Sequence, residues 1–166
     1  EDGGFGWIAI NIPLATYQLA FSPTFSMDRT LFAASENGLF QSTDRGDNWQ
    51  LVTAQLPMRG ILTISPAFAT DRTMLIKGWN GSVFRSTNGG VSWDAISLCS
   101  QTGIRQIAFS PAYSHDQTMF AVSDGGSFYR SHDNGVTCQP VNTPGGVGQL
   151  AVSPTYQDDQ TLILLS

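Results

Sequence analysis

The chain contains the stretch Ser42-Thr43-Asp44-Arg45-Gly46-Asp47-Asn48-Trp49, which returns twice further along. The later copies are Ser-Thr-Asn-Gly-Gly-Val-Ser-Trp at 86–93 and Ser-His-Asp-Asn-Gly-Val-Thr-Cys at 131–138, and a partial copy stands at 2–7. We call this stretch the turn motif. Its recurring positions are Asp2, Gly4, Trp7, Ser42, Asp44, Gly46, Trp49, Ser86, Asn88, Gly90, Trp93, Ser131, Asp133, Gly135 and Cys138.

A second pattern keeps the same period. It reads Ser-Pro-x-Phe/Tyr-x-x-Asp-x-Thr and begins at Ser22, Ser65, Ser110 and Ser153, with spacings of 43, 45 and 43 residues. A fixed period in this range indicates one supersecondary unit that buries its apolar surface against copies of itself. The chain is therefore a repeat protein.

Each repeat holds four short segments of β character. In the second complete repeat they are residues 61–64, 74–77, 83–86 and 93–96, rich in β-branched or aromatic residues and bounded by Gly, Pro, Asn and Asp. Asn37-Gly38, Asn80-Gly81 and Gly125-Gly126 suit two-residue hairpins between the second and third segments. Four antiparallel strands per repeat predict an all-β protein built from β-propeller blades. A solenoid is the alternative.

We interpret residues 1–166 as part of one propeller with about four blades. The predicted parts are an outer strand of a preceding blade at 1–12, blades at 18–53, 61–97 and 106–142, and an incomplete blade at 149–166. Both ends of the sequence fall inside a repeat. We therefore expect a window from a longer protein, with the remaining blades supplied by the same chain or a partner chain.

Composition argues against several classes of function. The net charge is −5, and the eight basic residues, seven of them Arg, are scattered, which argues against nucleic-acid binding. The sequence has no apolar run of the roughly 18–20 residues that span a bilayer. His115 and His132 stand in repeated turns with no acidic or cysteine cluster nearby in the sequence, so we expect no metal and no cofactor.

The two cysteines occupy different positions in consecutive repeats. Cys138 stands where the other copies of the turn motif have Trp, and the simplest interpretation is a small buried apolar substitute. A disulfide with Cys99 is the alternative.

Both repeated patterns have structural explanations. Asp44, Asn88 and Asp133 can accept hydrogen bonds from the backbone of their own turn, and the following glycines can adopt backbone angles that a side chain disfavours. We expect the tryptophans to insert between neighbouring units. We expect the repeated aspartates of the second pattern to cap the return loop, at Asp28, Asp71, Asp116 and Asp159.

The turn motif resembles the Asp-box of bacterial neuraminidase-type repeats, which occurs in sialidases, xyloglucan-cleaving glycoside hydrolases, sortilin-like receptors and photosystem II assembly propellers. The combined patterns look like large secreted repeat proteins of bacteria. The resemblance implies a propeller with the box at the blade periphery, in an extracellular or cell-surface bacterial protein.

The sequence departs from the enzymes of this group. The segment at 58–62 lacks the proline of the sialidase Arg-Ile-Pro signature, and Arg29, Arg72, Arg85 and Arg130 sit at repeated positions that do not indicate one converging cluster. We carry over no catalytic residue.

Connections alternate between the two faces of a propeller. The turn motifs and Ser-Pro loops must share one face, which repeats faithfully, while the Asn-Gly turns and blade-to-blade connections share the other, which varies. Since binding residues concentrate on loops of a rigid scaffold, we place candidate binding residues on this variable face. They are Tyr17, Glu36, Arg59, Trp79, Arg105 and Asp124.

Trp79 breaks the repeat beside a turn, and its indole could stack on a sugar or anchor a protein partner. The alternative is an indole lying flat on its own blade. Glu36 and Asp124 could pair for glycoside cleavage, but we expect solvated turn residues because an intervening blade separates them.

Three functions remain open. The first is a non-catalytic extracellular module that binds protein or carbohydrate through the variable face. The second is part of a secreted glycoside hydrolase. The third is a structural subunit of a larger assembly.

Overall fold

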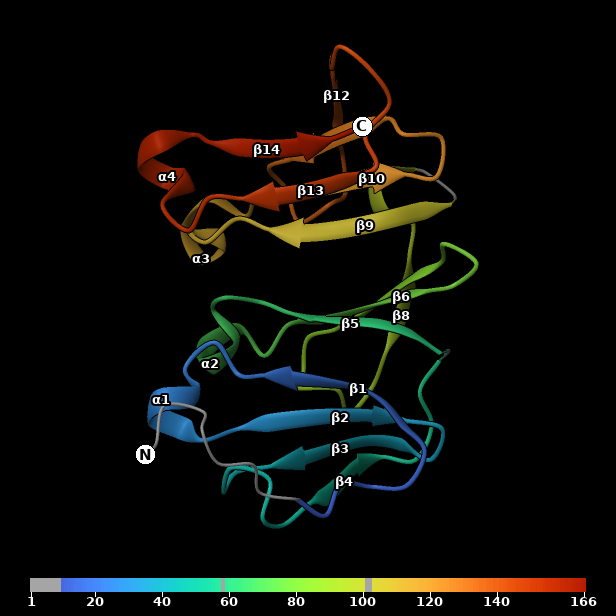
Figure 1. The fold of residues 1–166 in the computed structure, drawn as a ribbon, viewed down its shortest axis with the longest axis vertical. Coiled ribbons are helices and arrows are strands. Elements are labelled where there is room, and N and C mark those ends of the chain that lie inside the picture. The colour runs from blue at the N-terminus through green and yellow to red at the C-terminus, as the bar shows by residue number, and fades with distance from the viewer. Residues whose placement is uncertain (1–9, 58, 101–102) are drawn as a thin grey trace.

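The computed structural model describes residues 10–57, 59–100 and 103–166. They form three four-stranded antiparallel sheets and one two-stranded sheet (Figure 1). The strands are β1 (Thr16–Phe21), β2 (Leu31–Ser35), β3 (Gly38–Ser42) and β4 (Gln50–Thr53), then β5 (Gly60–Ile64), β6 (Met74–Gly78), β7 (Val83–Ser86) and β8 (Asp94–Ile96), then β9 (Ile104–Phe109), β10 (Met119–Ser123), β11 (Phe128–Ser131) and β12 (Gln139–Val141), and last β13 (Gln149–Val152) and β14 (Leu162–Leu165).

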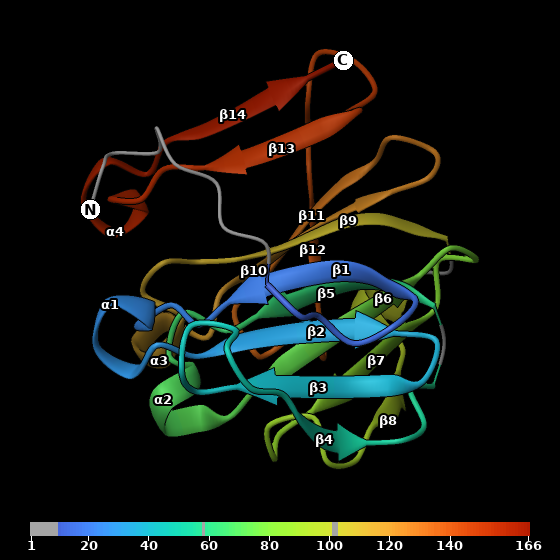
Figure 2. The same ribbon diagram turned by 60° about the horizontal axis from the view of Figure 1, so that its bottom comes forward.

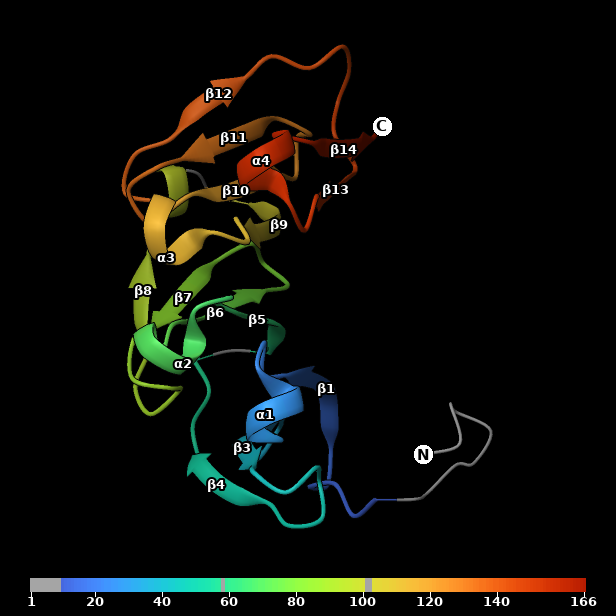
Figure 3. The same ribbon diagram turned by 90° about the vertical axis from the view of Figure 1, so that its left-hand side faces the viewer.

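Each sheet is a meander in which strands adjacent in sequence are adjacent in space. The sheets follow one another along a curved path, with first strands β1, β5, β9 and β13 on its concave side and β4, β8 and β12 on its outer side (Figure 3). This arrangement confirms the predicted all-β propeller fold and differs from a solenoid. The predicted outer strand at 1–12 falls largely on residues 1–9, outside the described residues, and residues 10–12 form no strand.

The core lies between the sheets, because the second strand of each four-stranded sheet is buried on both sides. Met74 and Ile76 of β6 pack with Phe32 of the first sheet, whereas Leu75 packs with Met119 of the third. In the same way, β10 directs Phe120 and Val122 toward Leu150 and Tyr156 of the last sheet. Alternate side chains of a strand point to opposite faces, so one strand contributes to two cores.

The return loop between the first and second strands holds a single helical turn in each blade. These turns are α1 (Phe25–Asp28), α2 (Phe68–Asp71), α3 (Tyr113–Asp116) and α4 (Tyr156–Asp159). The sequence patterns did not predict them, because four residues are too few to show a helical period. The loop aspartate of α2 closes the turn: Asp71 accepts a 2.6 Å hydrogen bond from Ser65 Oγ and a 2.8 Å bond from the Thr73 backbone N–H. The other blades repeat these bonds, which confirms the predicted capping role.

The turn motif closes the connection between the third and fourth strands. Buried Ser42 donates to Asp44 Oδ1 at 2.7 Å and accepts from the Gly46 N–H at 2.8 Å. Asp44 also accepts from the Asn48 N–H at 2.9 Å, and the Trp49 indole donates to the Gly46 carbonyl at 3.0 Å. Gly46 has φ +98°, which explains the glycine. Trp93 is half-buried and packs against the core between the first two sheets, whereas Trp7 lies outside the described residues.

The turn motif and return loop of a blade bond to one another. The Arg45 N–H donates to the Arg29 carbonyl at 3.1 Å. The equivalent bonds of the next two blades run from the Gly89 N–H to the Arg72 carbonyl and from the Asn134 N–H to the Gln117 carbonyl. On the opposite face, the Asp124 N–H donates to the Gly103 carbonyl at 2.6 Å, which joins a hairpin turn to a blade-to-blade connection. The predicted division into a repeated face and a variable face is confirmed.

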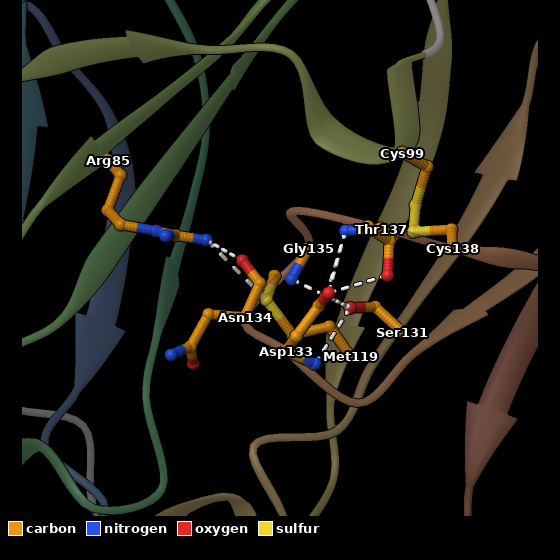
Figure 4. Close-up of a disulfide and its surroundings, with 9 residues drawn as sticks. All are labelled: Arg85, Cys99, Met119, Ser131, Asp133, Asn134, Gly135, Thr137 and Cys138. Carbon is orange, nitrogen blue, oxygen red and sulfur yellow. Dashed lines mark hydrogen bonds between the residues drawn. A yellow bond between two sulfur atoms is a disulfide. The ribbon is translucent and has the colours of Figure 1, made fainter.

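Cys99 and Cys138 form a disulfide (Figure 4), so the interpretation of Cys138 as a small apolar substitute is wrong. Cys99 lies in the turn η1 (Leu98–Ser100), on the connection between the second and third blades, and its N–H donates to the Gly135 carbonyl at 3.1 Å. The bond therefore fastens this connection to the turn motif of the third blade. It occupies the position at which the other blades use tryptophan.

Removing the disulfide will destabilise the chain. The sequence separation is 39 residues, and closing a loop of that size restricts the unfolded chain enough to stabilise the fold by about 3–4 kcal/mol. Urea denaturation of Cys99→Ala/Cys138→Ala should show this loss. Dithiothreitol should lower the stability of the unaltered chain and leave the double variant unchanged; equal stability of the two proteins without reductant would contradict the prediction.

The turn motif predicts acid sensitivity. Hydrogen bonds lower the pKa of Asp44 and of Asp133 from 3.8 to about 2, chiefly those donated by the side chains of Asn48 and Thr137. Because the folded pKa is depressed, the stabilisation is present above about pH 4 and is lost as the pH falls toward 2. Asp44→Asn/Asp133→Asn should therefore show a smaller fall in melting temperature between pH 4 and pH 2.

Asp47→Asn is the matched control, since Asp47 is an exposed carboxylate of the same motif. If Asp47→Asn reduces the fall in melting temperature as much as the double variant does, then general charge, and not these hydrogen bonds, causes the acid sensitivity.

Candidate functional site

Three of the predicted binding residues meet on the variable face where the first two blades join. Tyr17 is half-buried in β1, Glu36 stands on the turn between β2 and β3, and Arg59 immediately precedes β5. Arg59 Nη1 lies 3.2 Å from Glu36 Oε1, and the Arg59 guanidinium carbon lies 5.2 Å from the centre of the Tyr17 ring. Residues of two successive blades thus form one cluster, which we call the Tyr17 site.

Two hollows adjoin at this cluster. The larger, of about 810 Å³, extends from Tyr17 and Glu36 along the connection at 53–57 to Trp93 of the second blade. The smaller, of about 390 Å³, is lined by Tyr17, Arg59 and Trp79, with Gln18, Gly60 and Ile61 between them. Tyr17 and Arg59 line both hollows, so a ligand in either one would contact them.

Trp79 is 72% exposed. This favours the solvent-facing alternative over an indole that lies flat on its blade. Lys77, the only lysine of the chain, places its ammonium 5.9 Å from the centre of the Trp79 ring. Sequence reasoning did not single out Lys77, although its uniqueness in a chain of arginines was a visible signal.

The electrostatics of the site centre on the Tyr17 phenol. Burial raises the pKa of Tyr17, the Arg59 charge lowers it, and the Glu36 carboxylate raises it again. The phenol is thus a neutral hydrogen-bonding group beside a compensated ion pair. Such a site presents aromatic surface with polar groups at its rim.

Arg105 and Asp124 lie elsewhere, in the third blade. Arg105 donates a 2.9 Å hydrogen bond to the backbone carbonyl of Asp124, so the contact does not use the carboxylate. Glu36 and Asp124 stand on turns of the first and third sheets, with the second sheet between them. Within residues 10–57, 59–100 and 103–166, no three His, Cys, Asp or Glu side chains gather to hold a metal ion.

The architecture is shared with known structures. A xyloglucanase of glycoside hydrolase family 74 from Xanthomonas campestris matches 91% of this chain and 27% of its own, with 19% identity and a TM-score of 0.59. YCF48 bound to D1 peptide matches 92% of this chain and 51% of its own, with 17% identity and a TM-score of 0.56. The fold is that of a β-propeller.

A structure of the nidogen/laminin complex also matches, over 89% of this chain and 55% of the other, with 14% identity and a TM-score of 0.57. This propeller chain spans about a quarter to about half of these neighbours, and identities this low establish the fold alone. No family model and no curated protein matches the sequence. No helix in the described part of the chain is long and apolar enough to cross a membrane.

The charges around Tyr17 can be tested directly. Arg59→Gln removes the cation and should raise the Tyr17 pKa further, while Glu36→Gln should lower it. A pH titration followed by NMR of ¹³C-labelled tyrosine measures both shifts. Arg105→Gln, in the third blade, should leave the resonance of Tyr17 unchanged; a Tyr17 pKa that ignores Arg59→Gln would refute the contact.

Proposed function

We propose that this propeller is a non-catalytic extracellular module that binds a protein or carbohydrate chain through its variable face. The observation that carries this proposal is the Tyr17 site with exposed Trp79 beside it. The two hollows adjoin along the boundary between two blades, which suits an extended ligand rather than a small compact one.

The side chains suit ligands with alternating apolar and polar surfaces. An exposed indole offers a flat apolar face on which a sugar ring or an apolar side chain can stack. Arg59 and Glu36 supply donors and acceptors next to it. Tryptophan, tyrosine and arginine are the residues enriched at binding hot spots, and here all three line one hollow.

The carboxylates favour binding over glycoside cleavage. Cleavage by a carboxylate pair needs two carboxyl groups about 5–9.5 Å apart. Glu36 is engaged by Arg59, and the other candidate, Asp124, belongs to a different blade with one blade between. Glu36 and Asp124, the two carboxylates considered for glycoside cleavage, therefore do not form a catalytic pair at this site.

The disulfide supports an extracellular or cell-surface location. Disulfides persist in oxidising compartments and are rare in the cytosol, and Cys99–Cys138 joins two parts of the fold that the turn motif otherwise secures with tryptophan. A bacterial source remains part of the proposal and rests on the sequence resemblance.

The proposal is tested by binding to soluble xyloglucan and hydroxyethyl cellulose, a glycan array and a displayed peptide library. We expect one class to bind, and Trp79→Ala and Arg59→Ala each to weaken that binding about tenfold or more. Tryptophan fluorescence and calorimetry give the affinities.

Arg105→Ala is the matched control, since it removes an exposed arginine of the same face from another blade. Arg105→Ala should bind like the unaltered protein. Lack of binding to every probe would overturn the proposal, and release of reducing ends from a glucan would overturn its non-catalytic part.

A further inference from the structure

Positive charge gathers at the smaller hollow of the Tyr17 site, although the chain as a whole is acidic. The net charge is −5, from eight basic and 13 acidic residues. Arg59 lines this hollow, and the Lys77 ammonium lies 5.9 Å from the centre of the Trp79 ring, which also lines it. Among the residues that the structure describes, no Asp or Glu lines the smaller hollow, and Glu36 lines the larger one. The smaller hollow therefore favours an anionic ligand.

The register of the second sheet places Lys77 beside this hollow. Lys77 of β6 stands directly opposite Ile61 of β5, which lines the hollow. Directly opposite residues of an antiparallel pair project from the same face of the sheet. The equivalent residues of the first and third sheets are Ala34 and Val122, which are apolar and buried. The packing of the repeat therefore does not require a lysine here.

The ion pair between Arg59 and Glu36 is open to a competing carboxylate. Both side chains are 56% exposed, and the contact uses the Nη1 atom of Arg59. An exposed ion pair contributes little stability, and a guanidinium has five N–H donors that match a carboxylate two at a time. A ligand carboxylate can therefore replace Glu36 at little cost.

The surroundings of the hollow favour a sugar over a peptide. The Gln18 side chain accepts from the Leu62 N–H at 2.6 Å and donates to the Leu62 carbonyl at 2.9 Å, where β1 and β5 lie side by side (Figure 2). An extended peptide that added a strand to β5 would need these same backbone groups. The exposed Trp79 indole instead offers a flat face on which a pyranose ring can stack.

We propose that the Tyr17 site binds an acidic polysaccharide built of uronic acids. One sugar ring stacks on Trp79, and its carboxylate binds Arg59 and Lys77. The inference rests on the proposed binding function and narrows it to one class of ligand. A uronic acid combines, in one sugar, the flat ring and the carboxylate that these three side chains suit. Neighbouring sugars of the polymer extend into the larger hollow.

Calorimetry with polygalacturonate tests the proposal. The matched ligand is fully methyl-esterified polygalacturonate, which has the same sugars without the charge, and it should bind about tenfold more weakly or worse. Raising the NaCl concentration from about 20 to about 200 mM should weaken binding of polygalacturonate. Arg59→Gln should weaken this binding about tenfold, and Lys77→Gln about threefold.

Glu36→Gln distinguishes the acidic ligand from a neutral one, because it removes the carboxylate that competes for Arg59. It should strengthen binding of polygalacturonate about threefold, whereas a site for a neutral glucan would not gain affinity. Asp47→Asn is the matched control, since it removes one exposed carboxylate from the turn motif of the first blade and should leave the affinity unchanged. Circular dichroism checks that each variant is folded.

The outcomes separate this inference from the proposed function. Preferred binding of xyloglucan or of the esterified polymer would overturn the inference and leave the proposed function standing. Binding of poly-L-glutamate as tightly as polygalacturonate would overturn the choice of a sugar. If neither these polymers nor the glycan array and peptide library bind, both proposals are overturned.

Discussion

The structure depends on the burial of each middle strand between two neighbouring sheets. Burying an apolar side chain stabilises a fold by about 1.5–3 kcal/mol relative to exposure, but one four-stranded sheet cannot cover both of its own faces. Leu75 therefore requires the third blade, just as Met74 and Ile76 require the first. This mutual requirement explains why the sequence repeats, and why the outermost described faces retain exposed side chains such as Phe21 and Ile163.

The same hydrogen bonds close the equivalent loops of successive blades and so give each blade the same shape. In each four-stranded blade a buried serine and an aspartate close the return loop, and a second buried serine closes the turn motif. Satisfying buried backbone groups locally means that they do not need partners from a neighbouring blade. The repeated face is consequently committed to the scaffold, and the variable face is free to carry side chains such as Trp79.

The third blade shows that the scaffold accepts a different chemical solution. Tryptophan in the turn motif fills space between units, whereas Cys138 lets the chain tie the same region to Cys99 covalently. Arg85 of β7 adds a hydrogen bond to the Asn134 carbonyl across the same boundary (Figure 4). The boundary between the second and third blades thus has a disulfide and an arginine where the preceding boundary has Trp93 and the two hydrogen bonds between the Gln18 side chain and the Leu62 backbone. The Tyr17 site lies at the preceding boundary, where these two hydrogen bonds from Gln18 fix β1 against β5.

The sequence by itself determined the repeat, the four strands per blade and the division into two faces, because period, strand composition and turn residues are local properties. It also placed Asp71 and Asp44 in capping roles, since their partners lie within six residues. Only the tertiary structure decided the disulfide and the meeting of Tyr17, Glu36 and Arg59, which depend on how one blade is set against the next. It also separated Arg105 from that cluster, because Arg105 belongs to the third blade whereas the cluster lies where the first two blades join.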